Sequence, residues 1–385
     1  MRRHFLLCIL CFCLSACTFM PSPGGNPTGD PSETETVVSP PPADFSPTPA
    51  TAPPEPSVTP DSATESEPPA APEPVRVAFT GDVLLYGRMA EHYAQEGADA
   101  ILDPALAARL SGMDVTVANL EMAVSLRGSP LENKQFTFRG NPSDMPFLSE
   151  TMGVDAVSLA NNHTLDYGRD AFLDTMDTLR ENGIGYVGAG RTLDEALTPW
   201  ITEVCGRRIA LLAASRVIPA MDWYAGPNSP GVAGTYDPAL LNAAITAAKE
   251  TCDIVLVYVH WGIELNTLPE DYQRALARGY IDAGADAVIG SHPHVLQGFE
   301  FYNGKPIAYS LGNFVFTTSR AETCAAVLHI AEDALTLQVV PCTIKSPNTA
   351  LVTDAEVVTE RLRQLEAISF DVYFDEDGVL QPLAG

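Results

Sequence analysis

The sequence predicts an α/β fold, and two features of the chain from Val75 onward support this prediction. Short apolar runs typical of buried strands alternate with helical stretches, which is the pattern of βαβ units. Several of these apolar runs end in polar side chains, and α/β folds carry their sites outside the carboxyl ends of strands. The sequence therefore predicts a functional site where these strand ends meet.

The predicted elements follow in chain order. Strands are predicted at 75–79, 115–118, 156–159, 209–213, 254–259 and 287–289, and helices at 171–181, 238–250 and 272–283. The second helix begins at Asp237-Pro238, an N-cap residue followed by proline at the first helical position. After residue 294 the pattern changes to paired strands, 296–301 with 306–310 around the hairpin signal Asn303-Gly304, and 325–330 with 335–340. The tail from 354 to 368 is predicted to be a helix.

The N-terminus predicts export. Arg2-Arg3 precedes an apolar run from Phe5 to Leu14, which is short for a membrane span and typical of a signal peptide. The run ends in Leu14-Ser15-Ala16-Cys17, which resembles a bacterial lipobox and implies cleavage after residue 16 and a lipid on Cys17. An ordinary signal peptide with a chance cysteine is the alternative. The prediction is a lipoprotein held at the outer face of the bacterial cell membrane, with two or more acyl chains for stable anchoring.

Residues 17–74 are expected to be a disordered spacer. From residue 18 to 74 the chain has 17 of its 32 prolines, nine acids and no lysine or arginine. Such a segment buries too little apolar surface to fold, and its prolines keep it extended. The predicted organisation is a signal peptide at 1–16, this spacer at 17–74, a folded domain at 75–345, and a C-terminal helix and tail at 346–385 packed on the domain.

The charge of the chain argues against nucleic acid as a partner. Its 49 acids and 22 bases give a formal charge of −27, and 40 acids and 20 bases remain on residues 75–385. A surface this acidic repels phosphate backbones unless a local basic patch is present, and the sequence has none.

Four cysteines remain after the signal peptide and Cys17, namely Cys205, Cys252, Cys324 and Cys342. Three pairings are possible in an oxidising compartment. Cys324 and Cys342 are equidistant from Asp333, so a three-residue turn there would place them opposite each other. A cross-strand disulfide is one hypothesis, and structural or free thiols are the other.

The most informative stretch is Ser291-His292-Pro293-His294, directly after the apolar run 287–289. Proline favours an extended backbone at the preceding residue, and in an extended chain residues i and i+2 point to the same side. Both imidazoles are therefore expected to project together from a strand end. Four further strand ends carry polar groups: Gly81-Asp82, Asn119-Leu120-Glu121, Asn161-Asn162-His163 and His260-Trp261-Gly262. Carboxylate, amide and imidazole groups suit Mn²⁺, Fe²⁺ or Zn²⁺, so the set predicts a site for one or two divalent ions.

Together with Ser310-Leu311-Gly312-Asn313-Phe314, these motifs in this order resemble the capsule-synthesis (CapA-type) proteins. These proteins, also called poly-gamma-glutamate biosynthesis proteins, belong to the calcineurin-like metallophosphatase superfamily. The resemblance covers residues 75–316 and implies a four-layer sandwich of two mixed sheets flanked by helices.

The resemblance also implies a role for each motif residue. Asp82 matches an aspartate that contacts one or both metals. His294 matches a ligand of a first metal, and His260 and His292 match ligands of a second. Glu121 stands where a bridging carboxylate is usual, Asn162 matches an amide ligand, and His163 matches the acid that protonates the leaving group. One departure concerns the superfamily's opening Asp-x-His, because Leu84 stands at the histidine position and removes a ligand of the first metal.

Two other residues have open alternatives. Asp166 is expected either to orient the ring of His163 or to cap the following helix. Arg139 is expected either to hold an anionic substrate or to be an ordinary surface arginine.

Two functions follow from these predictions. The first is a metal-dependent hydrolase, metallophosphoesterase-like, in the synthesis or export of an anionic envelope polymer. The second is a non-catalytic, metal-stabilised subunit that guides an anionic polymer for a membrane synthase or export complex. Leu84 favours the second function, whereas His163 favours the first.

Overall fold

The structure is a computed structural model that describes residues 74–318 and 321–383. The predicted signal peptide, Cys17 and almost all of the predicted spacer lie outside these residues. Within the described residues, none of the helices combines the length and the apolar composition needed to cross a membrane.

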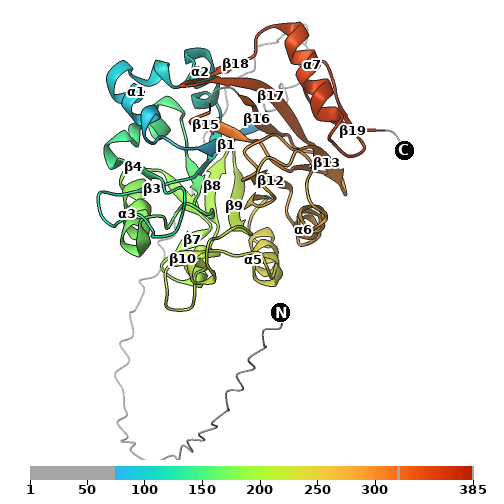
Figure 1. The fold of residues 1–385 in the computed structure, drawn as a ribbon. Helices are drawn as coiled ribbons and strands as arrows, with labels where there is room; N and C mark the ends of the chain where they lie inside the picture. The colour runs from blue at the N-terminus through green and yellow to red at the C-terminus, as the bar shows by residue number, and fades with distance from the viewer. Residues whose placement is uncertain (1–73, 319–320, 384–385) are drawn as a thin grey trace, which may run out of the picture. The chain divides into compact units, whose positions relative to one another are not determined.

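The first sheet is mixed and has the strand order β18-β17-β16-β1-β2-β5-β6, with β15 pairing beside β1 (Figure 1). Its parallel half is β1, β2, β5, β6 and β15, and β16, β17 and β18 join by antiparallel pairing. The strands are β1 Val75–Val83, β2 Val115–Leu120, β5 Ala156–Ser158, β6 Gly185–Val187, β15 Asn313–Val315, β16 Ala321–Ile330, β17 Leu335–Lys345 and β18 Asn348–Leu351.

The second sheet is also mixed and has the order β13-β14-β12-β11-β9-β8. Strands β9, β11, β12 and β14 run parallel, and β8 and β13 are antiparallel edges. The strands are β8 Trp200–Val204, β9 Arg207–Ser215, β11 Ile254–His260, β12 Ala287–Ser291, β13 Phe299–Tyr302 and β14 Lys305–Ala308. Asn303 and Gly304 form the predicted turn between β13 and β14, both with positive φ as a type I′ turn requires.

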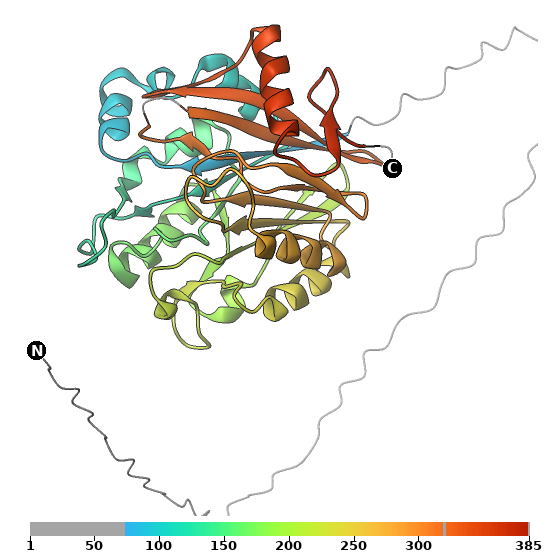
Figure 2. The ribbon, with the colours of Figure 1, turned by 45° about the vertical axis from the view of Figure 1, so that its right-hand side comes forward.

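Helices cover the outer face of each sheet, and the two inner faces pack on each other. One buried cluster joins apolar side chains from both sheets, such as Phe79 of β1 and Tyr258 of β11. A second cluster lies between the first sheet and α1 Arg88–Glu96, α2 Pro104–Ser111 and α3 Gly168–Glu181. A third lies between the second sheet and α5 Ala239–Lys249 and α6 Asp271–Asp282 (Figure 2). The expected four-layer α/β sandwich of two mixed sheets is therefore confirmed.

The C-terminal segment packs on this sandwich. The predicted tail helix is α7 Ala355–Glu366, and Asp354 caps it by accepting from the backbone amides of Glu356 and Val357. Leu362 and Leu365 of α7 close one end of the core between the sheets. The remaining short elements are α4 Leu193–Ala196, β3 Ala123–Val124, β4 Arg139–Gly140, β7 Ala189–Gly190, β10 Gly231–Val232, β19 Val372–Phe374, β20 Leu380–Pro382, and the single turns Ala98–Ala100, Pro142–Asp144, Phe147–Thr151 and Met221–Trp223.

The hypothesis of a Cys324–Cys342 disulfide is wrong, because all four thiols of the described residues are free. The turn between β16 and β17 holds four residues rather than three, since Ile330 pairs with Leu335. Cys324 therefore faces Pro341, one position away from Cys342. A shift of one residue turns a side chain to the other face of the sheet. Accordingly Cys324 lies between the sheets, and Cys342 lies under the helices of the outer face.

Candidate metal centre

Six predicted ligands converge where the two sheets meet. Asp82 lies near the end of β1, Glu121 follows β2, and Asn162 follows β5, all in the first sheet. His260 ends β11, and His292 and His294 follow β12 in the second sheet. Parallel strands present their carboxyl ends at one edge of a sheet, so the chain places all six side chains at adjoining edges. Five of them are buried, and His294 is largely buried.

The ligands form two groups that share one carboxylate. Glu121, His260 and His292 have donor atoms within 4.8 Å of one another, and so do Asp82, Glu121 and His294. His260 Nε2 lies 3.7 Å from Glu121 Oε1, and His294 Nδ1 lies 3.4 Å from Asp82 Oδ2 and 4.0 Å from Glu121 Oε2. The two oxygens of Glu121 thus face different groups, which is the arrangement of a carboxylate between two cations.

Amides and a hydroxyl hold the ligands in place. Asn119 Nδ2 donates to Asp82 Oδ1 at 2.8 Å, and Asn313 Oδ1 lies 2.8 Å from His294 Nδ1. Asn162 Oδ1 lies 2.8 Å from His260 Nε2, and Ser291 Oγ lies 3.1 Å from His260 Nδ1. Asn119 and Asn313 are aligned with Asp82 by strand register, so the neighbouring strands supply this support.

Four buried polar atoms of this cluster have no hydrogen-bond partner within the described part of the chain: Asp82 Oδ2, Glu121 Oε1 and Oε2, and His292 Nδ1. An unpaired buried carboxylate is costly, because burial removes its hydration without replacing it. A divalent cation would satisfy these atoms together, and carboxylate, imidazole and amide oxygen are donors that Mn²⁺, Fe²⁺ and Zn²⁺ accept. The residues present therefore fit one or two such ions.

The pKa values of the cluster agree with this fit. Burial, and then the charge of Asp82, raise the pKa of Glu121 well above its ordinary value. Burial lowers the pKa of His260, and it lowers that of His292 to about 4, so both imidazoles are neutral at pH 7 and in the form that binds metal. Burial disfavours a charged His294, but Glu121 and Asp82 outweigh burial and raise its pKa to about 10. Two carboxylates thus attract a positive charge to this position.

The backbone of the histidine motif differs from the prediction. His292 and His294 have φ values of 99° and 59°, so the segment is left-handed rather than extended. The imidazoles nevertheless lie together, with ring centroids 5.9 Å apart. Positive φ is a strained conformation for a residue with a Cβ, and such strain is concentrated at functional sites.

Leu84, at the position of the missing motif histidine, packs in the core between the first sheet and its outer helices. Its backbone amide donates to the carbonyl of Val315. The first motif therefore contributes Asp82 to the centre, and Leu84 contributes an apolar side chain to the core instead of a second ligand.

His163 lies beside the centre with Asp166 and Lys134. His163 Nδ1 is 2.6 Å from Asp166 Oδ2, which also accepts from the backbone amide of Phe138. Asp166 therefore contacts the ring of His163 rather than capping α3, whose N-cap residue is Tyr167. Lys134 Nζ contacts Asp166 Oδ1, the carbonyl of Asn162 and His163 Nδ1. Sequence reasoning missed Lys134, because a single lysine in a loop 28 residues before Asn162 carries no spacing signal.

Arg139 has local partners. Its guanidinium lies over the ring of Tyr167, 4.4 Å from the centroid, and donates to the carbonyls of Arg127 and Gly128. These contacts occupy the group, and a role toward substrate stays a prediction.

The fold and the site define a class of protein: an α/β sandwich with a buried cluster of candidate cation ligands where its two sheets meet. Residues 76–318 match the family described as bacterial capsule synthesis protein PGA_cap, and the chain belongs to this family.

The chain is also similar to proteins named for PGA biosynthesis, capsule biosynthesis or polyglutamine synthesis. The chain is 37% identical over 245 residues to the PGA biosynthesis protein CapA of Bacillus subtilis, a match that covers 62% of each chain. It is 31% identical over 304 residues to the capsule biosynthesis protein CapA of Bacillus anthracis, covering 76% of this chain and 73% of the relative. It is 35% identical over 214 residues to a probable polyglutamine synthesis accessory protein of Mycobacterium tuberculosis, covering 52% of this chain and 55% of the relative. The match therefore spans less than two thirds of the length of the Bacillus subtilis protein.

Proposed function

We propose that this protein is a metal-dependent phosphoester hydrolase of the cell envelope, acting in the synthesis or export of an anionic polymer. One observation carries the proposal: Glu121 is buried, has no hydrogen-bond partner among the described residues, and is shared by two groups of candidate ligands. A carboxylate between two divalent cations is the arrangement used in phosphoester hydrolysis.

Each side chain has a distinct part in this proposal. Asp82, Glu121, Asn162, His260, His292 and His294 would hold one or two ions of Mn, Fe or Zn, which supply a Lewis acid for the phosphoryl oxygens and a water of lowered pKa. Because the carboxylate of Asp166 accepts a hydrogen bond, Nδ1 of His163 carries a proton and Nε2 exchanges one with substrate. The water oxygen would bond to phosphorus and release a proton to solvent while the ester P–O bond breaks. The departing oxygen would take the proton from Nε2, and solvent would return a proton to His163.

Burial lowers the pKa of His163 in the metal-free protein, so the imidazole is neutral at pH 7 until substrate binds. An anionic ester beside the ring would raise this pKa, because a nearby negative charge favours the protonated form. Binding of substrate would thus load the proton that the departing oxygen needs.

The proposal includes a place of action. A lipid on Cys17 and the proline-rich spacer 17–74 would hold the domain outside the cell, at the membrane that contains a polymer synthase or export complex. The names of three relatives, among them a probable polyglutamine synthesis accessory protein, support an association with polymer synthesis.

A second candidate is a non-catalytic accessory subunit that uses the metal for stability. Leu84 favours it, because a leucine in the core replaces a usual ligand. The contacts of His163 with Asp166 and Lys134 favour the hydrolase, since metal binding alone does not require an oriented imidazole beside the ligands.

The test is metal analysis followed by turnover. The purified chain is loaded with Mn²⁺ or Zn²⁺, its metal content is measured by mass spectrometry, and hydrolysis of phenyl phosphate and of a phosphodiester is followed. We expect one or two ions per chain and measurable turnover. Glu121→Gln should lower metal content, whereas His163→Gln should keep the metal and lower kcat on the order of 100-fold or more.

Glu376→Gln, in the exposed β19–β20 turn, is the matched control for a carboxylate-to-amide change and should alter neither quantity. Full metal content without turnover of any phosphoester would favour the accessory subunit. An unchanged rate in His163→Gln would remove His163 from the mechanism.

A further inference from the structure

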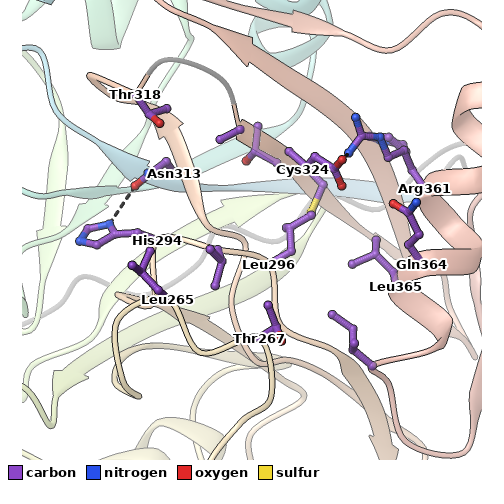
Figure 3. A pocket seen from close by; sticks show the side chains of 16 residues that line it. Leu265, Thr267, His294, Leu296, Asn313, Thr318, Cys324, Arg361, Gln364 and Leu365 are labelled. Carbon is purple, nitrogen blue, oxygen red and sulfur yellow. Dashed lines mark hydrogen bonds and ion pairs between the residues drawn. The ribbon is translucent and has the colours of Figure 1, made fainter.

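A cavity of about 460 Å³ begins at the candidate metal centre and extends away from it to α7 (Figure 3). His294 and Asn313 lie at one end, and Arg361, Gln364 and Leu365 of α7 lie at the other. Its volume is that of a site for a small molecule. A ligand bound through the metal centre would therefore have space for a second portion in this cavity.

The wall of the cavity is mainly apolar. Its apolar lining comes from the segment after the histidine motif, from β16 and β17, and from α7: Val295, Leu296, Cys324, Pro341, Leu365 and Ile368. Apart from His294 at the metal centre, Arg361 is the one cationic side chain among the described residues of the wall, and it is ion-paired with Glu322, which also lines the cavity. An anionic polymer would need a series of cationic partners here, whereas a hydrocarbon chain gains from each apolar contact.

The loop that forms the outer wall is also apolar and is fixed to the centre. Ile263, Leu265 and Leu268 expose more than half of their surface, and Leu265 also lines the cavity. The amide of Leu265 donates to the carbonyl of Pro293, between His292 and His294. Leu265 has a φ of 63°, a strained conformation for a bulky side chain that is typical of ligand-binding segments.

We infer that the substrate is a phosphoester that carries a hydrocarbon chain, with its phosphate at the metal centre and its chain in this cavity. The inference rests on the proposed function and specifies the substrate class. The anionic group is bound by the cations and the histidines beside them, and the apolar group is bound by the lining. The loop with Ile263, Leu265 and Leu268 offers the chain an apolar path from a lipid surface to the cavity.

The test is binding of alkylphosphonates, which contain a P–C bond in place of the scissile ester bond. Methyl-, butyl- and octylphosphonate are titrated by calorimetry into the full chain loaded with Mn²⁺. Each buried methylene strengthens binding about fourfold, so octylphosphonate should bind at least ~100-fold more tightly than methylphosphonate. Equal affinities, or failure of all three compounds to bind, would overturn the inference.

Three variants locate the binding of the chain. Thr267→Trp and Gln364→Trp place a large ring in the cavity from two different elements, the segment between β11 and α6 and the helix α7, at positions exposed enough to accept one. Each should reduce the advantage of octylphosphonate to a few-fold and leave the affinity for methylphosphonate unchanged. Thr359→Trp, also on α7 but outside the cavity lining, is the matched control and should keep the full advantage. Loss of the advantage in the control, or its retention in both cavity variants, would contradict the inference.

Turnover separates this inference from the proposed function. Phenyl phosphate and octyl phosphate are assayed with the same preparations. Turnover of both with no effect of chain length on binding overturns the inference and leaves the hydrolase standing. A strong effect of chain length on binding without turnover of either ester supports the cavity as an amphiphile site and counts against the hydrolase.

Discussion

At the scale of single residues, the neighbours of His163 set the orientation and the pKa of its imidazole. Asp166 accepts from its Nδ1, the ring of Phe138 lies against it with centroids 4.4 Å apart, and Lys134 contacts both His163 and Asp166. Burial lowers the pKa of the Lys134 amine, and the charge of Asp166 opposes this effect. Lys134 is therefore a positioning residue: it partly neutralises the carboxylate that holds the imidazole.

Replacing Lys134 with methionine should raise the pKa of His163. Burial is the main cause that lowers this pKa, and the positive charge of Lys134 lowers it further. Removing the charge also leaves Asp166 more negative, which favours the protonated imidazole in the same direction. The measurement is an NMR titration of the His163 Cε1–Hε1 signal in the metal-free protein, assigned with His163→Gln.

Lys134→Arg is the matched control, because it keeps the positive charge and should shift the pKa less than methionine does. An unchanged or lowered pKa in Lys134→Met would show that Lys134 does not act on His163. A merely structural role would not produce a shift of defined sign.

At the scale of elements, the centre depends on a close approach of β1 to the segment before β15. The amide of Asp82 donates to the carbonyl of Gly312 at 2.9 Å, and Asn313, the next residue, contacts His294. Gly81 permits this approach, because a Cβ at position 81 would lie 1.8 Å from the Gly312 oxygen. Two members of the group Asp82, Glu121 and His294 are thus positioned where β1 meets this segment.

Gly81→Ala should destabilise the protein by about 2 kcal/mol or more, since β1 and the Gly312 segment must separate to admit the methyl group. It should also weaken Mn²⁺ binding, because Asp82 moves with the strand. Gly279→Ala in α6 is the matched control: a Cβ there meets nothing within 4 Å, and alanine should stabilise the helix by up to about 1 kcal/mol. Denaturant unfolding and calorimetric titration measure both effects. Equal changes in the two variants would contradict this account of Gly81.

Most of the strands and helices could be predicted from the sequence. All six strands predicted from apolar runs and all four predicted helices are present, because their burial follows from local pattern and period. The three-residue turn that would place Cys324 opposite Cys342 is not formed, and the prediction of an extended backbone at His292 and His294 is wrong. Both depend on contacts with distant residues, which a local pattern does not contain.

The candidate site divides in the same way. The six candidate ligands end or follow predicted strands, so the rule that parallel strands present their carboxyl ends together was sufficient to group them. Lys134 lies in the loop between β3 and β4, where no period or strand end marks it. The cavity beside the centre is built from the histidine segment, β16, β17 and α7, and it exists only once these elements are packed.

At the scale of the whole molecule, the two sheets contribute different chemistry. The first sheet supplies the carboxylates and the amide, Asp82, Glu121 and Asn162, and the second supplies the three imidazoles. A cation bound by both groups would therefore connect the two sheets. The excess of acids in residues 75–385 repels a free phosphate anion, so the proposed binding of a phosphoester would depend on the cations and on apolar contact in the cavity.

The last prediction follows from this connection between the sheets. Because the donor atoms belong to both sheets, a cation at ~1,000 times its Kd should stabilise the fold by about 4 kcal/mol. Glu121→Gln removes the shared carboxylate and keeps its shape. In the metal-free state this variant should be at least as stable as the parent protein, because a buried carboxyl group without a hydrogen-bond partner among the described residues is replaced by a neutral amide. Its gain from Mn²⁺ should fall below about 1 kcal/mol, since both ligand groups lose a donor.

Thermal unfolding measures the stability of the parent protein and of Glu121→Gln, each with and without Mn²⁺. Glu376→Gln should match the parent protein under both conditions. If Mn²⁺ stabilised Glu121→Gln as much as the parent, the ion would bind elsewhere, and Glu121 would not be the shared ligand. If metal-free Glu121→Gln were much less stable than the metal-free parent, the carboxylate would have a structural partner, and the reason for assigning it to a metal would be lost. The proposed function requires the opposite of both results. The Glu121 carboxylate should not stabilise the metal-free protein, and it should be needed for the stabilisation by Mn²⁺.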